Sequence, residues 1–178
     1  MTDLSTHVLA ETIALFRKQK ALGEKALAQV SDPDLVAVLD PEANSIAHIV
    51  RHLHGNMRSR WTDFLTTDGE KADRHRDTEF ELPAGTGRAE VLAWWNAGWG
   101  YLFAALDELT PADLTRTVSI RGQPLSVLSA ILRQLDHYAQ HVGQVVLLAK
   151  HARGSEWQTL SIARGKSEEY LRSVRGKA

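Results

Sequence analysis

The stretch Asp136-His-Tyr-Ala-Gln-His-Val-Gly-Gln144 carries the pattern from which the fold and the site are predicted. It lies within residues 124–151, where apolar residues recur every three or four positions, as in an amphipathic helix. His137 and His141 are four residues apart, so both side chains lie on one face of that helix, one turn apart. Two imidazoles at this spacing can bind one metal ion, but many such pairs only form hydrogen bonds. The pair needs a third partner before it indicates a metal site.

The composition narrows the class of protein. The chain has 178 residues, a net charge of −1 and no run of apolar residues long enough for a membrane span. We therefore expect a single domain over residues 1–178, no nucleic-acid binding and no membrane insertion. The start of the sequence lacks the pattern of a secretory signal, which favours a cytoplasmic protein. Because the chain has no cysteine, metal ligands must come from His, Asp or Glu.

Three more segments have helical periodicity, and with residues 124–151 they predict an all-α four-helix bundle. These segments are residues 3–30, 45–66 and 88–109. Ser45 or Asn44 is the expected N-cap of the second helix. Residues 66–87 form a polar loop, long enough either to cover a functional site or to be a solvated connection.

The remaining segments predict shorter elements. Residues 115–122 alternate well enough for a short strand or hairpin that turns at Arg121-Gly122. Pro124 is then expected in the first turn of the long helix. Ser31-Asp-Pro-Asp34 is expected to break the chain, residues 157–163 to be extended, and the segment around residues 168–171 to form a last short helix.

Two residue sets allow two interpretations each. Trp95 and Trp99 stack at helical spacing in residues 88–109, where they either belong to the core or floor an apolar substrate pocket. His48, His52 and His54 all lie in the second helix. By angle, His48 points away from the core, and His52 and His54 flank the apolar stripe on opposite sides. Periodicity alone cannot choose between His52 and His54.

Two motifs resemble a known superfamily. The stretch Asn44-Ser-Ile-Ala-His-Ile-Val-Arg-His52-Leu53 resembles the start of the second helix in the DinB/YfiT-like superfamily, where one His supplies the first metal ligand. The stretch from His137 to Gln144 resembles the same superfamily's His-x-x-x-His-x-Gly-Gln signature, which supplies two more ligands. Helix order and length also agree over roughly residues 5–150. The chain looks closest to a DinB-like branch of uncharacterised function.

The resemblance implies several properties. It implies a bundle with up-down-down-up connectivity, a divalent metal ion (zinc or nickel), and a homodimer. It identifies His52, His137 and His141 as the ligands, in preference to His48 or His54. Characterised relatives include S-transferases that use bacillithiol, mycothiol or glutathione.

Three neutral imidazoles would leave the metal's charge uncompensated and a coordination position open, as in catalytic zinc sites. Such a metal can hold a thiol as thiolate or acidify a bound water. Without cysteine, any thiolate must come from a co-substrate. The first hypothesis is therefore a metal-dependent thiol S-transferase acting on small electrophiles. The alternatives are a metal-water hydrolase, a metal- or ligand-binding dimer without turnover, and a metal-free polar His network. The sequence identifies no general base.

Overall fold

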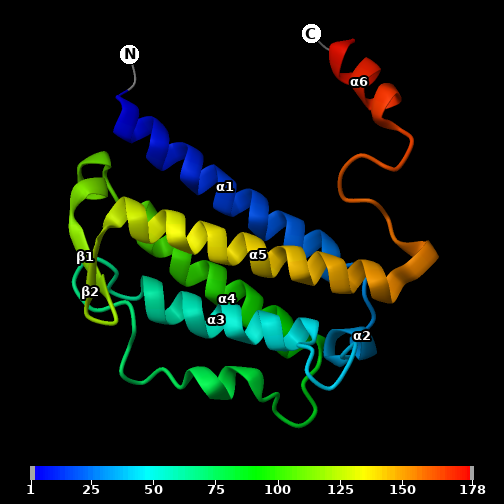
Figure 1. The fold of residues 1–178 in the computed structure, drawn as a ribbon, viewed down its shortest axis with the longest axis horizontal. Coiled ribbons are helices and arrows are strands. Elements are labelled where there is room, and N and C mark those ends of the chain that lie inside the picture. The colour runs from blue at the N-terminus through cyan, green and yellow to red at the C-terminus, as the bar shows by residue number, and fades with distance from the viewer. Residues whose placement is uncertain (1–2, 177–178) are drawn as a thin grey trace.

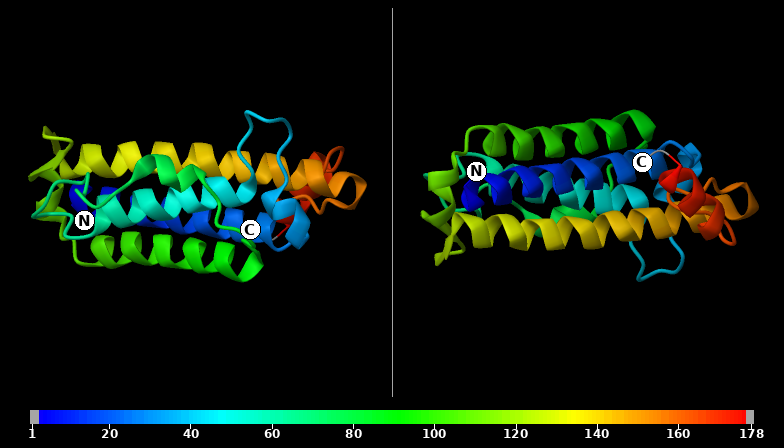
Figure 2. Two further views of the ribbon diagram at one scale, coloured as in Figure 1. Left: turned by 90° about the horizontal axis from the view of Figure 1, so that it is seen from below. Right: turned by 90° about the horizontal axis from the view of Figure 1, so that it is seen from above.

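The four periodic segments form the four long helices of the bundle (Figure 1). The computed structural model describes residues 3–176. Its long helices are α1 (Leu4–Leu27), α3 (Ile46–Trp61), α4 (Arg88–Asp107) and α5 (Val127–Arg153). Helices α1 and α5 run in one direction and α3 and α4 in the other, as Figures 1 and 2 show. The predicted all-α four-helix bundle and its up-down-down-up order are confirmed.

Aromatic side chains from three of these helices fill the core. Phe16 of α1, Trp95 and Trp99 of α4, and Tyr138 of α5 are at most 2% exposed. The Trp99 ring lies 5.5 Å from Trp95 and 6.0 Å from Tyr138, in edge-on arrangements that aromatic pairs prefer. Gly23 of α1 permits this packing, since a Cβ there would overlap with the Trp95 ring. The tryptophans therefore belong to the core, and the alternative that they floor a substrate pocket is wrong.

Local capping sets where the helices begin. Ser45 Oγ accepts a hydrogen bond from the His48 backbone N–H at 3.3 Å, which confirms Ser45 as the N-cap of α3. The break predicted at residues 31–34 is present at Ser31, which is extended, but from Asp32 the chain forms the short helix α2 (Asp32–Val36). The reason is a capping box, in which the Ser31 backbone N–H and hydroxyl both donate to the Asp34 carboxylate, at 2.8 and 2.6 Å.

A two-stranded hairpin precedes α5, as predicted. Strands β1 (Thr117–Ile120) and β2 (Gln123–Ser126) pair antiparallel. Arg121 and Gly122 form the turn with φ values of 56° and 71°, the left-handed conformation of two-residue hairpin turns. The predicted position of Pro124 is wrong, because it lies in β2 opposite Ser119 and α5 begins at Val127.

The segment between α3 and α4 folds over the bundle. It contains the 3₁₀ helix η1 (Arg76–Phe80), which packs against α3. Asp68 fixes the segment to the hairpin, because its carboxylate accepts hydrogen bonds from the backbone N–H groups of Arg121 and Gly122, both at 2.8 Å. The polar segment therefore packs on the bundle as part of the fold and is not only a solvated connection.

The remaining elements lie at the ends of the bundle. The 3₁₀ helix η2 (Pro111–Thr115) precedes the hairpin, and the 3₁₀ helix η3 (Gly154–Glu156) follows the end of α5. Residues 157–163 are irregular and pair with no strand in the described part of the chain, so the expected extended element is not formed. The predicted last helix is α6 (Ser167–Arg175), which stands away from the bundle in Figure 1. Within residues 3–176, no helix is long and apolar enough to cross a bilayer.

Candidate metal centre

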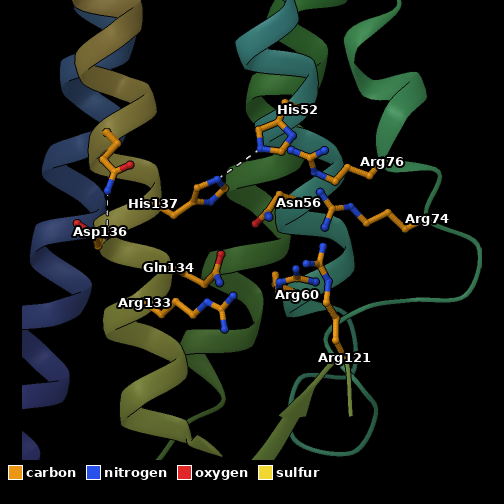
Figure 3. A pocket seen from close by; sticks show the side chains of 11 residues that line it. His52, Asn56, Arg60, Arg74, Arg76, Arg121, Arg133, Gln134, Asp136 and His137 are labelled. Carbon is orange, nitrogen blue, oxygen red and sulfur yellow. Dashed lines mark hydrogen bonds between the residues drawn. The ribbon is translucent and has the colours of Figure 1, made fainter. Parts of the chain in front are cut away.

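Three histidines converge in the gap between α3 and α5. His52 comes from the middle of α3, and His137 and His141 come from successive turns of α5. The Nε2 atom of His137 lies 3.4 Å from Nε2 of His52 and 3.0 Å from Nε2 of His141. One nitrogen from each ring lies within 4.8 Å of the other two. Figure 3 shows the rings of His52 and His137 pointing toward one another.

These separations fit a metal ion. Imidazole nitrogens bind zinc at about 2.0–2.1 Å, so two ligands of a tetrahedral site lie roughly 3.3 Å apart. The nitrogen separations of 3.4 and 3.0 Å are close to that spacing. The group of His52, His137 and His141 could therefore hold a metal ion.

Glu79 orients the His52 ring. The Nδ1–H of His52 donates to Glu79 Oε2 at 2.8 Å, which leaves the Nε2 lone pair directed at the cluster. Arg74 holds the same carboxylate with two hydrogen bonds, Nε to Oε1 at 2.7 Å and Nη2 to Oε2 at 2.9 Å. Burial raises the pKa of Glu79, but the hydrogen bonds from His52 and Arg74 outweigh it and the pKa is lowered. Gly55 lets η1 come this close, since a Cβ there would overlap with the Glu79 carboxylate.

Gln144 orients the His141 ring. The His141 Nδ1–H donates to Gln144 Oε1 at 2.8 Å, which again leaves Nε2 free for the cluster. Burial and the neighbouring rings of His141 and His52 lower the pKa of His137 to about 3. Burial also lowers the pKa of His141. Both rings are therefore neutral near pH 7, the form that binds a metal ion.

The other histidines lie elsewhere. His54 points to α4, where its ring lies 6.2 Å from that of Tyr101, on the side of α3 away from His52. The prediction that His52 and His54 flank the apolar stripe on opposite sides is confirmed. His48 is half-buried and hydrogen-bonded to Ser45, and His75 is exposed. Only His52 joins the α5 pair, the choice that periodicity had left open.

A comparison with models of protein families identifies the family to which the chain belongs. The model of the family described as "Protein of unknown function (DUF1572)" matches residues 3–166. The chain belongs to the DUF1572 family. No curated protein matches it. The range matched by DUF1572 includes the four long helices, the hairpin and all three clustered histidines, and α6 follows it.

A cavity of about 270 Å³ opens beside the cluster in this DUF1572 chain (Figure 3). Its lining includes His52 and His137, and every residue of that lining is polar or charged. The remaining lining residues are Asn56, Arg60, Arg74, Arg76, Arg121, Arg133, Gln134, Asp136 and Gln140. The cavity is thus a polar space, unlike the apolar substrate pocket that Trp95 or Trp99 would have floored.

Sequence reasoning did not find Glu79 or Arg74. Both lie in the polar stretch of residues 66–87, where many acidic and basic residues alternate. Glu79 is 7% exposed, whereas its acidic neighbours Asp77 and Glu81 are exposed. The length of this stretch is typical of a segment that covers a site, but no spacing in it identifies the one carboxylate that reaches α3.

Proposed function

We propose that His52, His137 and His141 bind one divalent metal ion and that the chain is a metal-dependent enzyme. The reaction proposed is the conjugation of a low-molecular-weight thiol to a small electrophile: a sulfur–carbon bond forms as the bond to the electrophile's leaving group breaks, and the thiol proton passes to solvent. The observation that carries the proposal is the convergence of three Nε2 atoms, two of them on rings whose Nδ1–H is held by Glu79 or Gln144. Zinc and nickel both accept imidazole ligands and are the expected metals.

The chemistry follows from charge. A dipositive ion with three neutral ligands and an open position stabilises a thiolate, or a hydroxide, near neutral pH. The chain's own residues keep the rings neutral and fixed, since burial lowers the pKa of His137 and Glu79 holds His52. The cavity beside the cluster supplies space for a small co-substrate next to these rings. With no cysteine in the chain, that co-substrate must bring the thiol.

The first test is elemental analysis of protein purified without a His tag, where one metal ion per chain is expected. Metal-loaded protein is then supplied with bacillithiol, mycothiol or glutathione and a chlorinated arene. Conjugation should exceed that of metal-free protein and of His137→Ala. If metal binds but no thiol is conjugated and none perturbs the metal's spectrum, the chain is a binding protein without turnover. Metal-dependent ester hydrolysis without thiol would instead support the hydrolase.

We also propose that DUF1572 is related to the DinB/YfiT-like superfamily and that this chain forms a homodimer. The first is supported by helix order and by the His52, His137 and His141 positions. The second rests on the resemblance and on exposed apolar side chains of α5, Leu132 and Leu147. Light scattering at micromolar concentration should give twice the chain mass, and a monomer mass would refute the dimer.

A further inference from the structure

The cavity beside the histidines collects arginines from four separate segments of the chain. Arg60 comes from α3, Arg74 and Arg76 from the segment with η1, Arg121 from the hairpin turn and Arg133 from α5. Figure 3 shows their side chains around one space. Guanidinium groups gathered in this way repel one another, so their arrangement requires anions.

Three of these arginines are bound to carboxylates of the protein. Arg74 is bound to Glu79, and it also lies 3.3 Å from a Glu70 oxygen. Arg60 contacts Glu70 at 3.1 Å, and the Nε of Arg121 contacts the same oxygen at 2.8 Å. Glu70 is thus shared by three guanidinium groups, which leaves positive charge in excess.

Arg133 and Arg76 are free to bind a ligand. Within residues 3–176, Arg133 makes no hydrogen bond or ion pair to another side chain. Arg76 lies over the Phe80 ring at 5.3 Å, and its nearest carboxylate is the exposed Asp77 at 3.8 Å. Of the described residues that line the cavity, Asp136 is the single carboxylate, and it accepts a hydrogen bond from Gln140 at 2.9 Å.

Two buried polar atoms in the cavity lining also lack a partner. Gln134 is 4% exposed, and its Oε1 has no hydrogen-bond partner among the described residues. Arg60 is 5% exposed, and its Nε likewise has no partner there. Buried polar groups are nearly always paired, so the two atoms leave unmet hydrogen-bonding capacity in the side chains that line the cavity.

We propose that this cavity binds the anionic group, a carboxylate or a phosphate, of the co-substrate whose thiol reaches the histidine cluster. This inference rests on the proposed function and deepens it. Guanidinium groups bind both anions through paired, charge-assisted hydrogen bonds, with Arg133 and Arg76 as the binding groups. The volume of about 270 Å³ suits a small metabolite.

The test compares three thiols of similar size on cobalt(II)-loaded protein: neutral 2-mercaptoethanol, 3-mercaptopropionate and 2-mercaptoethyl phosphate. The visible absorption of cobalt reports thiol binding without turnover. We expect an anionic thiol to reach half-saturation at a concentration about tenfold or more below that of the neutral thiol, the size of one charge-assisted hydrogen bond. The anionic thiol with the lower value identifies the anion. Arg133→Gln should remove most of this advantage, and Arg76→Gln part of it.

Lys150→Gln is the matched control, since Lys150 is exposed on α5 outside the cavity and the charge change is the same. It should leave the advantage intact. Equal half-saturation for neutral and anionic thiols, or an advantage unchanged in the Arg133→Gln/Arg76→Gln double variant, would refute the anion site while thiol binding stands. If cobalt does not bind or no thiol alters its spectrum, the proposed function fails. Calorimetric titration of metal-free protein with phosphate and propionate then decides the anion site. Binding that Arg133→Gln weakens would support the site, and binding that is absent or unchanged in Arg133→Gln would refute it.

Discussion

Tyr138 and His137 are neighbours in the sequence, yet they belong to two different regions of the molecule. Tyr138 is fully buried among the aromatic rings of the core, and His137 lies in the polar cavity between α3 and α5. A short hydrogen-bond chain connects the regions: the Trp61 Nε1–H donates to Tyr138 Oη, which donates to Asn56 Oδ1, both at 2.9 Å. Asn56 in turn lines the cavity.

The difference between the two regions lies in how each is stabilised. The core buries apolar area, which needs no particular partner for each side chain. The cavity buries charged groups, and these require partners such as Glu79 for His52 and Glu70 for Arg60. A change in the core should therefore affect folding, and a change in the cavity should affect binding. The predictions below test this separation.

The largest expected effect is on metal binding. His52→Ala should reduce bound metal from one ion per chain to none, because two α5 imidazoles alone do not complete the site. His54→Ala is the matched control, since His54 lies on the same helix but points to α4. Elemental analysis of both purified variants measures the effect. Loss of metal in His54→Ala with metal retained in His52→Ala would overturn the ligand assignment.

The next effect is on folding. Trp95→Ala should lower the free energy of unfolding by about 3–5 kcal/mol, because it removes a large buried ring packed against Trp99 and Gly23. Urea unfolding measures the loss. Under native conditions the folded variant should still bind one metal ion per chain. Weakened metal binding in the folded variant would show that the core and the cavity are not separate.

A smaller effect is expected from Glu79→Gln. The amide keeps the shape but removes the negative charge that orients His52 and pairs with Arg74. Loss of such a partner typically weakens metal affinity about 10–100-fold. Competition with a chelator measures the affinity. Glu81→Gln, at an exposed position two residues later, should bind metal as tightly as the original chain.

The sequence predicted the core better than the cavity. The core follows from a repeated pattern, and each long helix was found within a few residues of its ends. The α5 half of the site also follows from spacing, since His137 and His141 share a face. The choice of His52 required the resemblance, because a helix has two flanks and periodicity treats them alike.

The cavity depends on contacts between segments far apart in the chain. Arg121 reaches it from the hairpin turn, which Asp68 holds by hydrogen bonds, and Arg74 reaches it from beside η1, which packs against α3. Such contacts have no local pattern, and the acidic and basic residues of the loop are alike in sequence. The presence of a long polar segment could be predicted, but its inward-facing members could not.

The smallest expected effect is the change of the free energy of unfolding with pH, measured on metal-free protein. Burial lowers the pKa of His137 to about 3 and that of His141 below its ordinary value. In the unfolded chain both rings titrate near about pH 6.5, so there they bind protons first as the pH falls. The contribution of the two rings to the free energy of unfolding should therefore be complete above about pH 6.5. Below that pH the free energy of unfolding should fall, by at most about 1.4 kcal/mol per pH unit for each ring.

Urea unfolding between about pH 7.5 and 5.5 avoids the titration of carboxylates. His137→Asn should show a shallower decline than the original chain, because one ring of lowered pKa is gone. His75→Asn is the control, since His75 is exposed and should leave the slope unchanged. An unaltered slope in His137→Asn would mean that His137 accepts its proton in the folded protein. The cavity would then be more open to water than its geometry indicates.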